Sequence, residues 1–325
     1  MCELAADPDP RNWKVPAVLS ALLLAAMACA STTPAATPTQ VPDRVSSVPA
    51  NAVKMGPEND ANPVGSYSAE YAQPVLLPGE VNTAGAEDSP FILPDGNTLY
   101  FFFSPDMNVP VEQQVFDGVT GIYVSHKNGG EWDAGERVYL EVPGTPSLDG
   151  CAFINEDVIW FCTVREGLSG MHWFTARQKG GIWQEWTAAD FDPEYQVGEL
   201  HMTKDGTGLY FHSARPGGMG GVDIWFSAKT GEGWGEPVNL AAVNSPGTDG
   251  WPALSQDETE LWFYRDYETW RSKRIGDEWQ PPEKMFGPLA GEPTLDSEGN
   301  VYFIHHYYRG DEGIEADVYV SYKVR

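Results

Sequence analysis

The sequence predicts an all-β fold, a five-bladed β-propeller made of four-stranded antiparallel blades. Two observations support this prediction. The 325 residues include 34 glycines and 26 prolines, which favours many turns over long helices. Short runs rich in aromatic and β-branched residues also recur at intervals of 45 to 52 residues. A repeat of about this length is typical of propeller blades.

Residues 198–245 show one complete blade. Four apolar runs alternate there with turn-forming residues, which are the Asp205-Gly206 turn, the glycine loop 217–221, and Gly231 with Gly233. Runs bounded in this way predict an antiparallel meander of four strands.

The same marks occur five times along the chain. A pair of aromatic residues marks each second strand, and an aromatic residue two places before Ser or Thr marks each third strand. The second-strand pairs begin at Tyr100, Trp160, Tyr210, Trp262 and Tyr302; the third-strand aromatics are Tyr123, Trp173, Trp225, Trp270 and Tyr319; and outer-strand tryptophans follow at Trp132, Trp183, Trp234 and Trp279.

The missing outer strand of the fifth blade is expected from the N-terminal side of the domain. Residues 71–77 and 81–83 align with residues 234–240 and 243–245 of the complete blade. A strand from this segment would close the ring and remove the exposed edges of an open sheet. The alternative is six blades, with a degenerate blade inside the insertion from 106 to 118.

The repeats resemble the WD-like propeller repeat of the TolB type. The resemblance rests on Ser213-x-Arg215, the glycine loop and Asp223-Ile-Trp-x-Ser227, together with Asp249-x-x-Pro252-x-Leu-Ser255. It covers about residues 70–325, and repeat two is the most divergent. Because most members of that superfamily are non-enzymatic scaffolds or periplasmic binding proteins, the resemblance implies a fold and no activity.

Residues 1–29 have the form of an export signal. Arg11 and Lys14 precede an apolar stretch, and small residues lead to Cys29. This ending resembles a bacterial lipoprotein signal, which implies lipidation of Cys29; ordinary secretion and a retained N-terminal anchor are the alternatives. Residues 30–65 are rich in Thr, Pro, Ala and Ser and predict a disordered tether, so the propeller is expected over residues 66–325.

The net charge of −27 disfavours some partners. A strongly negative chain repels nucleic acid and anionic membrane, and no basic stripe is present. We therefore expect no nucleic-acid partner and membrane contact only through the N-terminal lipid. The signal-like segment predicts a location at the periplasmic or extracellular face of the envelope, where we expect a monomer.

Cys151 and Cys162 flank a predicted hairpin. A two-residue turn at Glu156-Asp157 would place the two cysteines opposite each other. Cross-strand Cβ atoms are close enough for a disulfide, which export permits. The alternative is a pair of small buried hydrophobic residues, and no spacing typical of a zinc site is present.

Each first strand opens with acidic residues, which fall into two registers. Glu87, Asp149 and Asp249 match the Asp-x-x-Pro motif of the repeat, so we expect them to bind backbone amides. Glu199 and Glu292, one residue before the aligned proline position, are less explained by the repeat, and together with Asp88 they are the expected carboxylates at the channel mouth. Possible ligand-binding partners there are His201, Arg215, Trp251 and Arg265.

Two functions remain open from the sequence. The first is a non-catalytic binding or scaffold module that recognises an envelope protein or a glycan at one face of the ring. The second is a glycoside hydrolase that uses Asp88, Glu199 and Glu292, since such enzymes need two carboxylates about 5–9.5 Å apart. No cofactor is expected, although carboxylates at the mouth suit calcium.

Overall fold

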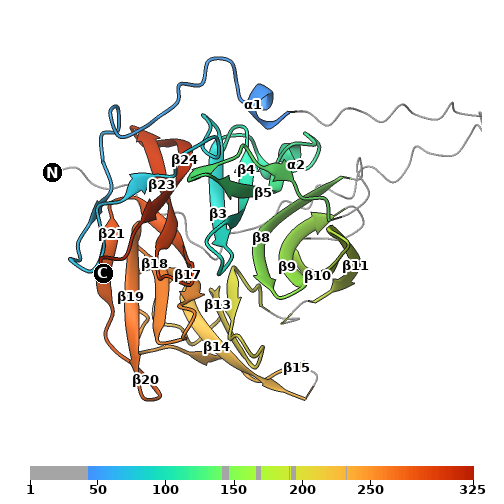
Figure 1. Ribbon diagram of the computed structural model, residues 1–325. Coiled ribbons are helices and arrows are strands. Elements are labelled where there is room, and N and C mark those ends of the chain that lie inside the picture. Colours follow the sequence, from blue (N-terminus) through green and yellow to red (C-terminus); the bar gives the residue numbers. More distant parts are fainter. Residues whose placement is uncertain (1–42, 141–145, 166–169, 190, 192–194, 232) are drawn as a thin grey trace, which may run out of the picture.

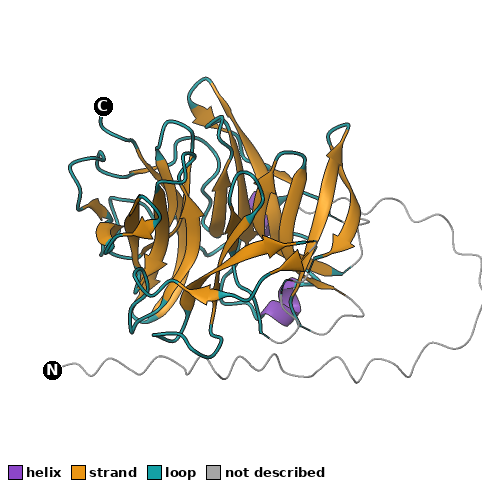
Figure 2. Ribbon diagram, turned by 90° about the horizontal axis from the view of Figure 1, so that it is seen from below, coloured by secondary structure: helices purple, strands orange, loops and turns teal. Residues whose placement is uncertain are grey.

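The computed structural model describes residues 43–140, 146–165, 170–189, 191, 195–231 and 233–325. Strands dominate this part of the chain (Figure 2), and its two helices, α1 (Arg44–Ser47) and α2 (Val111–Gln114), have four residues each. Neither of these helices approaches the length needed to cross a membrane.

The described strands form four sheets, of which the nine-stranded sheet joins two antiparallel groups through a parallel bridge. We divide the strands into five consecutive antiparallel groups, repeats 1 to 5 (Figure 1). Repeat 1 holds β3 (Ala86–Ile92), β4 (Thr98–Ser104), β5 (Gly121–Asn128), β6 (Glu131–Trp132) and β7 (Glu136–Arg137). Repeat 2 holds β8 (Ser147–Asn155), β9 (Val158–Arg165), β10 (His172–Lys179) and β11 (Ile182–Ala188). Repeat 3 holds β12 (Leu200–Met202), β13 (Gly208–Ser213), β14 (Asp223–Thr230), β15 (Gly233–Trp234) and β16 (Val238–Asn239).

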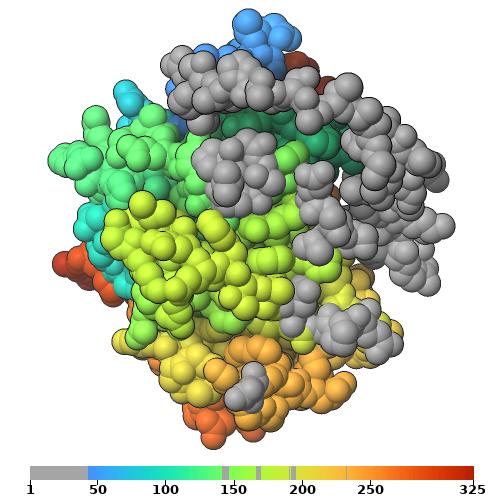
Figure 3. Space-filling view, turned by 90° about the vertical axis from the view of Figure 1, so that its right-hand side faces the viewer, coloured from blue at the N-terminus to red at the C-terminus, as the bar shows by residue number. Residues whose placement is uncertain are grey.

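Repeat 4 holds β17 (Asp249–Leu254), β18 (Glu260–Arg265), β19 (Glu268–Ile275), β20 (Glu278–Trp279) and β21 (Glu283–Gly287). Repeat 5 holds β22 (Ala290–Leu295), β23 (Val301–Arg309), β24 (Glu312–Ser321) and β2 (Val75–Leu76). In Figure 3, repeat 2 lies between repeat 1 and repeats 3 and 4 on the surface. All-β architecture with the predicted strand order is therefore confirmed, while the number of blades in the ring stays a prediction.

The N-terminal segment supplies the outer strand of repeat 5, as the alignment predicts. In β2, Val75 pairs with Val320 and Leu76 with Tyr319 of β24. Parallel bridges between Ala316 and Ala86 and between Gly79 and Trp132 join repeat 5 and its N-terminal strand segment to repeat 1. The insertion from 106 to 118 contains α2 and no strand, so it offers no strands for a sixth blade.

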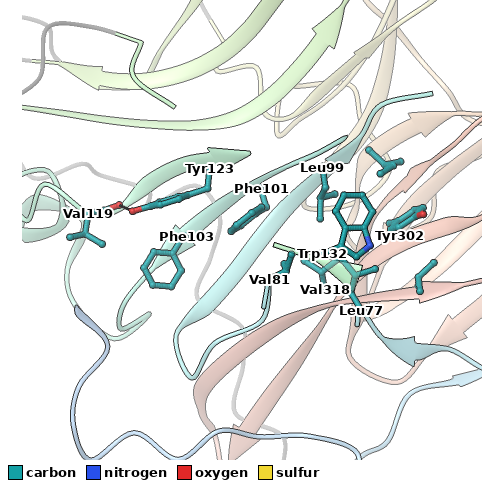
Figure 4. Close-up of a cluster of buried hydrophobic side chains, with 12 residues drawn as sticks. Leu77, Val81, Leu99, Phe101, Phe103, Val119, Tyr123, Trp132, Tyr302 and Val318 are labelled. Atoms are coloured by element: carbon teal, nitrogen blue, oxygen red, sulfur yellow. Dashed lines mark hydrogen bonds between the residues drawn. The ribbon is translucent and has the colours of Figure 1, made fainter. Parts of the chain in front are cut away.

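The repeated aromatic residues form the contacts between neighbouring repeats. Phe101, Phe161, Phe211, Phe263 and Phe303 are at most 2% exposed. Burial of one such side chain contributes about 1.5–3 kcal/mol. In the cluster of Figure 4, Trp132 of repeat 1 meets Tyr302 of repeat 5 edge-on, at 6.3 Å between ring centroids. The repeated aromatic residues thus pack together where repeats 1 and 5 meet and the ring closes.

The expected end of the tether at residue 65 needs correction. Residues 43–64, which we call the arm, contact the strands through Arg44, Lys54 and Asp60. The next two residues form β1 (Gly65–Ser66), which pairs with β21 of repeat 4. The folded domain therefore begins by residue 43. Cys29, the export signal and residues 30–42 lie outside the described residues.

Candidate binding site at the central channel

A β-bulge interrupts the first strand of four repeats at matching places. The pairing register shifts between Asp88 and Phe91, between Gly150 and Phe153, between Gly250 and Ala253, and between Gly291 and Thr294. One residue in each bulge has a positive φ: Ser89 (44°), Cys151 (54°), Trp251 (51°) and Glu292 (52°). This backbone conformation costs a non-glycine residue of order 1–3 kcal/mol. Its recurrence indicates that the surrounding sheet holds these side chains at the channel.

The four bulge residues and their counterpart Glu199 line one cavity. Its volume is about 30 Å³, and its other lining residues include Phe91, His201 and Thr294. This is room for one or two water molecules. The first strands of all five repeats contribute to the lining, so the cavity marks the centre of the ring.

Three carboxylates converge on Ser89. Its hydroxyl donates to Oε1 of Glu199 at 2.7 Å. Its backbone N–H is shared between Oε2 of Glu292 at 2.9 Å and Oδ1 of Asp88 at 3.0 Å. The structure thus brings together the three acids that the sequence placed at the channel mouth.

Two of these carboxyl groups retain protons more strongly than usual. Burial raises the pKa of Glu199 to about 7, although the Ser89 hydroxyl lowers it and the Asp88 charge adds to the rise. Burial, followed by the charges of Asp88 and Glu199, raises the pKa of Glu292 well above its usual value. The site therefore holds at least one proton near neutral pH, which is a property that a general acid requires.

The indole of Trp251 and His201 also line the cavity, and His212 lies beside them against Trp251. The backbone N–H of Trp251 donates to Nδ1 of His212 at 3.1 Å, and their rings lie 4.5 Å apart. His201 packs edge-on against Phe153 at 4.9 Å. Burial lowers the pKa of His201 and of His212 to about 4, so neither adds positive charge at pH 7.

Asp88 occupies a position that is glycine in the other repeats. Its counterparts are Gly150, Gly198, Gly250 and Gly291. A Cβ on Gly291 would lie 2.9 Å from Cδ2 of Tyr264, and one on Gly250 would lie 3.3 Å from Cγ of His212. Packing against the neighbouring repeat thus explains why Gly250 and Gly291 have no side chain. The carboxylate of Asp88 departs from this repeated glycine.

The structure places Arg215 and Arg265 away from the cavity, so both leave the candidate site. The guanidinium of Arg265 donates to Asp249 and lies over Phe263 at 5.2 Å. That of Arg215 lies over Phe211 at 4.9 Å. Aromatic faces attract guanidinium groups, and here that attraction stabilises the interior of repeats 3 and 4.

Two acids of the first set, Glu87 and Asp249, bind backbone amides as their register predicts. Glu87 accepts from the backbone N–H of Thr83, and Asp249 accepts from that of Ser245. Asp149 differs, because its partners include the hydroxyls of Ser147 and Thr163.

Cys151 and Cys162 are joined by a disulfide, with their Cα atoms 5.4 Å apart. The expected hairpin register holds from Asn155-Val158 to Phe153-Trp160. The bulge then shifts it, so Gly150 rather than Cys151 is the partner of Cys162. Cys151 consequently reaches the channel cavity.

The described residues contain no group of three or more His, Cys, Asp or Glu side chains placed to hold a metal ion. Calcium at the channel mouth stays a prediction.

Sequence reasoning missed Ser89 and His212 as parts of the site. Ser89 precedes Pro90 as Trp251 precedes Pro252 and Glu292 precedes Pro293. This shared position before proline could have identified Ser89. No sequence feature identifies His212, because it joins the site only through its contact with Trp251 of the neighbouring repeat.

No protein-family model matches the chain, and no curated protein matches its sequence. Solved structures of similar arrangement include an endo-arabinase from Bacteroides thetaiotaomicron, with 14% identity, 77% of this chain and 97% of that chain covered, and a TM-score of 0.46. A gluconolactonase from Xanthomonas campestris has 11% identity, coverage of 82% and 95%, and a TM-score of 0.45. A putative TolB from Agrobacterium tumefaciens has 15% identity, coverage of 77% and 78%, and a TM-score of 0.40. At these identities, none of the named activities transfers to this chain.

Proposed function

We propose that the chain is a non-catalytic binding or scaffold propeller of the bacterial cell envelope. It recognises a protein or glycan ligand at one face of the ring. The signal-like segment supports export, and the sequence before Cys29 supports a lipid anchor at the periplasmic or extracellular face. A net charge of −27 supports a monomer without a nucleic-acid partner.

The size of the channel cavity is the observation that carries this proposal. Its volume of about 30 Å³ is roughly tenfold below the 300–1,000 Å³ of ordinary small-molecule sites. Glu199 and Glu292 are also both bonded to Ser89. A sugar ring does not fit between groups held in this way, so a ligand would contact the rim of the channel from outside.

The alternative function is glycoside hydrolysis, and the protonation of the site favours it. Hydrolysis of a glycosidic bond needs one protonated and one ionised carboxyl group. The raised pKa values of Glu199 and Glu292 would provide the protonated group. Asp88 would then be the second carboxyl group at the site.

Incubation of the full chain with a panel of aryl glycosides and an immobilised glycan array separates the two functions. We expect no product release above that of the variant E199Q/E292Q. Retention on a glycan spot without cleavage supports glycan recognition, and an empty array directs the search to cross-linking with envelope proteins. Hydrolysis that E199Q or E292Q abolishes, with unchanged circular dichroism and melting temperature, would overturn the proposal.

A further inference from the structure

Four repeats share an arginine above the second aromatic residue of their second strand. The distances from guanidinium carbon to ring centroid are 5.4 Å for Arg165 over Phe161, 4.9 Å for Arg215 over Phe211, 5.2 Å for Arg265 over Phe263 and 5.2 Å for Arg44 over Phe101. Repeats 2 and 4 provide this arginine as the last residue of their second strand, and repeat 3 provides it two residues after its second strand ends. Repeat 1 has none there and receives Arg44 from the arm.

The guanidinium of Arg44 is bound by a carboxylate, two carbonyl groups and aromatic rings, which are the groups expected in a binding site for arginine. Its side chain is 4% exposed, and Nη1 donates to Oε1 of the buried Glu87 at 2.8 Å. The guanidinium also donates to the carbonyls of Glu80 and Val81. Phe103 and Tyr123 complete the aromatic wall around it.

A second cationic group of the arm is held in the same manner. Nζ of Lys54 lies between the carboxylates of Glu315 and Asp317 on β24, both at most 1% exposed. Farther along, Asp60 pairs with Nε2 of His305 at 2.9 Å. The acidic seam, which we define as Glu87, Glu315 and Asp317, thus accepts one arginine and one lysine ten residues apart.

The arm rests on the strands without joining a sheet. Each hydrogen bond between residues 43–64 and the described strands uses a side chain, and the backbone ladder begins only at Gly65. Its apolar contacts come from Val48, Met55 and Val64, which are partly buried. In Figure 1 the arm runs over the outside of the strands from α1 towards β21. Apart from the buried Arg44 and Asp60, the arm thus has few buried apolar contacts, and segments of this kind open locally at lower free energy than core strands.

We propose that the acidic seam is an exchangeable peptide-docking site. The arm is its built-in occupant, and the fitting partner is a protein segment that presents an arginine and a lysine spaced as in Arg44 and Lys54. The chain itself shows which chemistry the seam accepts. When the arm opens, Glu87, Glu315 and Asp317 lose their counter-charges, and the negative field of the whole chain attracts a cationic replacement. This site is separate from the channel and does not depend on the function proposed there.

Hydrogen exchange of the full chain tests whether the arm opens separately. We expect amides of residues 45–62 to exchange at least tenfold faster than those of β3 and β24. R44Q should accelerate exchange in the arm at least tenfold further without affecting β3. The matched control is R325Q, because Arg325 is exposed and its partner Glu298 lies elsewhere. Equal exchange in the arm and the core strands, in both the wild type and R44Q, would overturn the proposal.

A synthetic peptide of residues 43–62 tests whether the seam accepts a segment in trans. The peptide should bind the full-chain variant R44Q/K54Q at least tenfold more tightly than it binds the wild type, because the variant's own arm no longer competes. A peptide with glutamine at both basic positions should not bind. Loss of the arm's protection in the wild type under excess peptide gives a second readout that needs no variant. Absence of binding to R44Q/K54Q, or failure of that variant to fold, contradicts an exchangeable arm.

Discussion

The hydroxyl of Ser89 donates to Oε1 of Glu199 at 2.7 Å, and this bond joins the first strand of repeat 1 to repeat 3 across the channel. The amide of the same serine donates to Glu292 of repeat 5. One residue therefore ties three repeats together at the centre of the ring. Because these contacts come from three repeats, the protonation of Glu199 and Glu292 depends on the ring being assembled.

The first prediction concerns E199Q and the pH dependence of stability. The pKa of Glu199 is about 7 in the folded chain and near 4.5 without the fold. The folded state thus binds the proton more strongly, so this group's contribution is complete below about pH 4.5 and is lost as the pH rises through 7. The loss amounts to about 3 kcal/mol. E199Q should remove this decline, measured as the difference between urea unfolding curves of wild type and variant from pH 4.5 to 7.5.

Glu236 provides the control for this measurement, because it is exposed and far from the channel. E236Q should follow the wild-type curve at every pH. A difference between wild type and E199Q that stays constant between pH 4.5 and 7.5 would show that Glu199 is not protonated in the folded chain near neutral pH.

The second prediction concerns the contact between repeats 4 and 5. In G291A the new methyl group would lie 2.9 Å from the Tyr264 ring, closer than real Cβ contacts allow. Overpacking of this kind costs about 1–3 kcal/mol. Gly233 has no heavy atom within 4 Å of a built Cβ, so G233A should change the free energy of unfolding by less than about 0.5 kcal/mol. Equal melting temperatures for the two variants would contradict the interlocking role of Gly291.

The strand order and the closure by residues 75–76 could be predicted because they follow from short-range repetition. An aromatic pair recurs in every second strand, and a sequence alignment can detect it. The bulges could not be predicted in this way. Each bulge adds one residue to its strand. Cys151 and Glu292 therefore face a different side of the sheet from the one that strict alternation along the strand predicts.

Part of the candidate site was also predictable. Asp88, Glu199, Trp251 and Glu292 stand out because the repeat does not require their side chains. Arg215 and Arg265 were assigned to the mouth as polar residues, yet aromatic faces hold them inside. Arg44 shows the limit most clearly. Its partner Glu87 is 43 residues away in sequence, and composition alone assigns residue 44 to a disordered tether.

The third prediction concerns Arg271, a fully buried arginine that contacts three carboxylates. It pairs with Glu260 and Glu283 of its own repeat and with Glu70 of the N-terminal segment. R271M would remove the buried cation between these carboxylates, although Glu70 and Glu283 are about half exposed and keep Lys273 as a neighbour. It should lower the free energy of unfolding by about 1–3 kcal/mol. R325M should cost less than about 1 kcal/mol, because the pair of Arg325 with Glu298 is exposed.

The pH dependence of R271M gives an independent check. Hydrogen bonds and charge from Arg271 lower the pKa of Glu70 to about 2. A lowered pKa means that the contribution is complete above the unfolded value near 4.5 and is lost as the pH falls towards 2. The difference in stability between wild type and R271M should therefore shrink on acidification. A stability difference between wild type and R271M that grows below pH 4 would show that it does not come from the pair of Arg271 and Glu70.

The fourth prediction concerns the disulfide between Cys151 and Cys162, which closes a hairpin with a sequence separation of 11. In the chain-entropy model, a closed loop of this length stabilises the fold by about 3 kcal/mol. C151S/C162S should lose this amount, and dithiothreitol should lower the melting temperature of the wild type while leaving that of the variant unchanged. Because Cys151 also lines the channel cavity, the titration of Glu199 followed by NMR should shift in the variant. Wild-type stability that is insensitive to dithiothreitol, together with quantitative labelling of both thiols in the folded chain, would show that the two cysteines are reduced in solution.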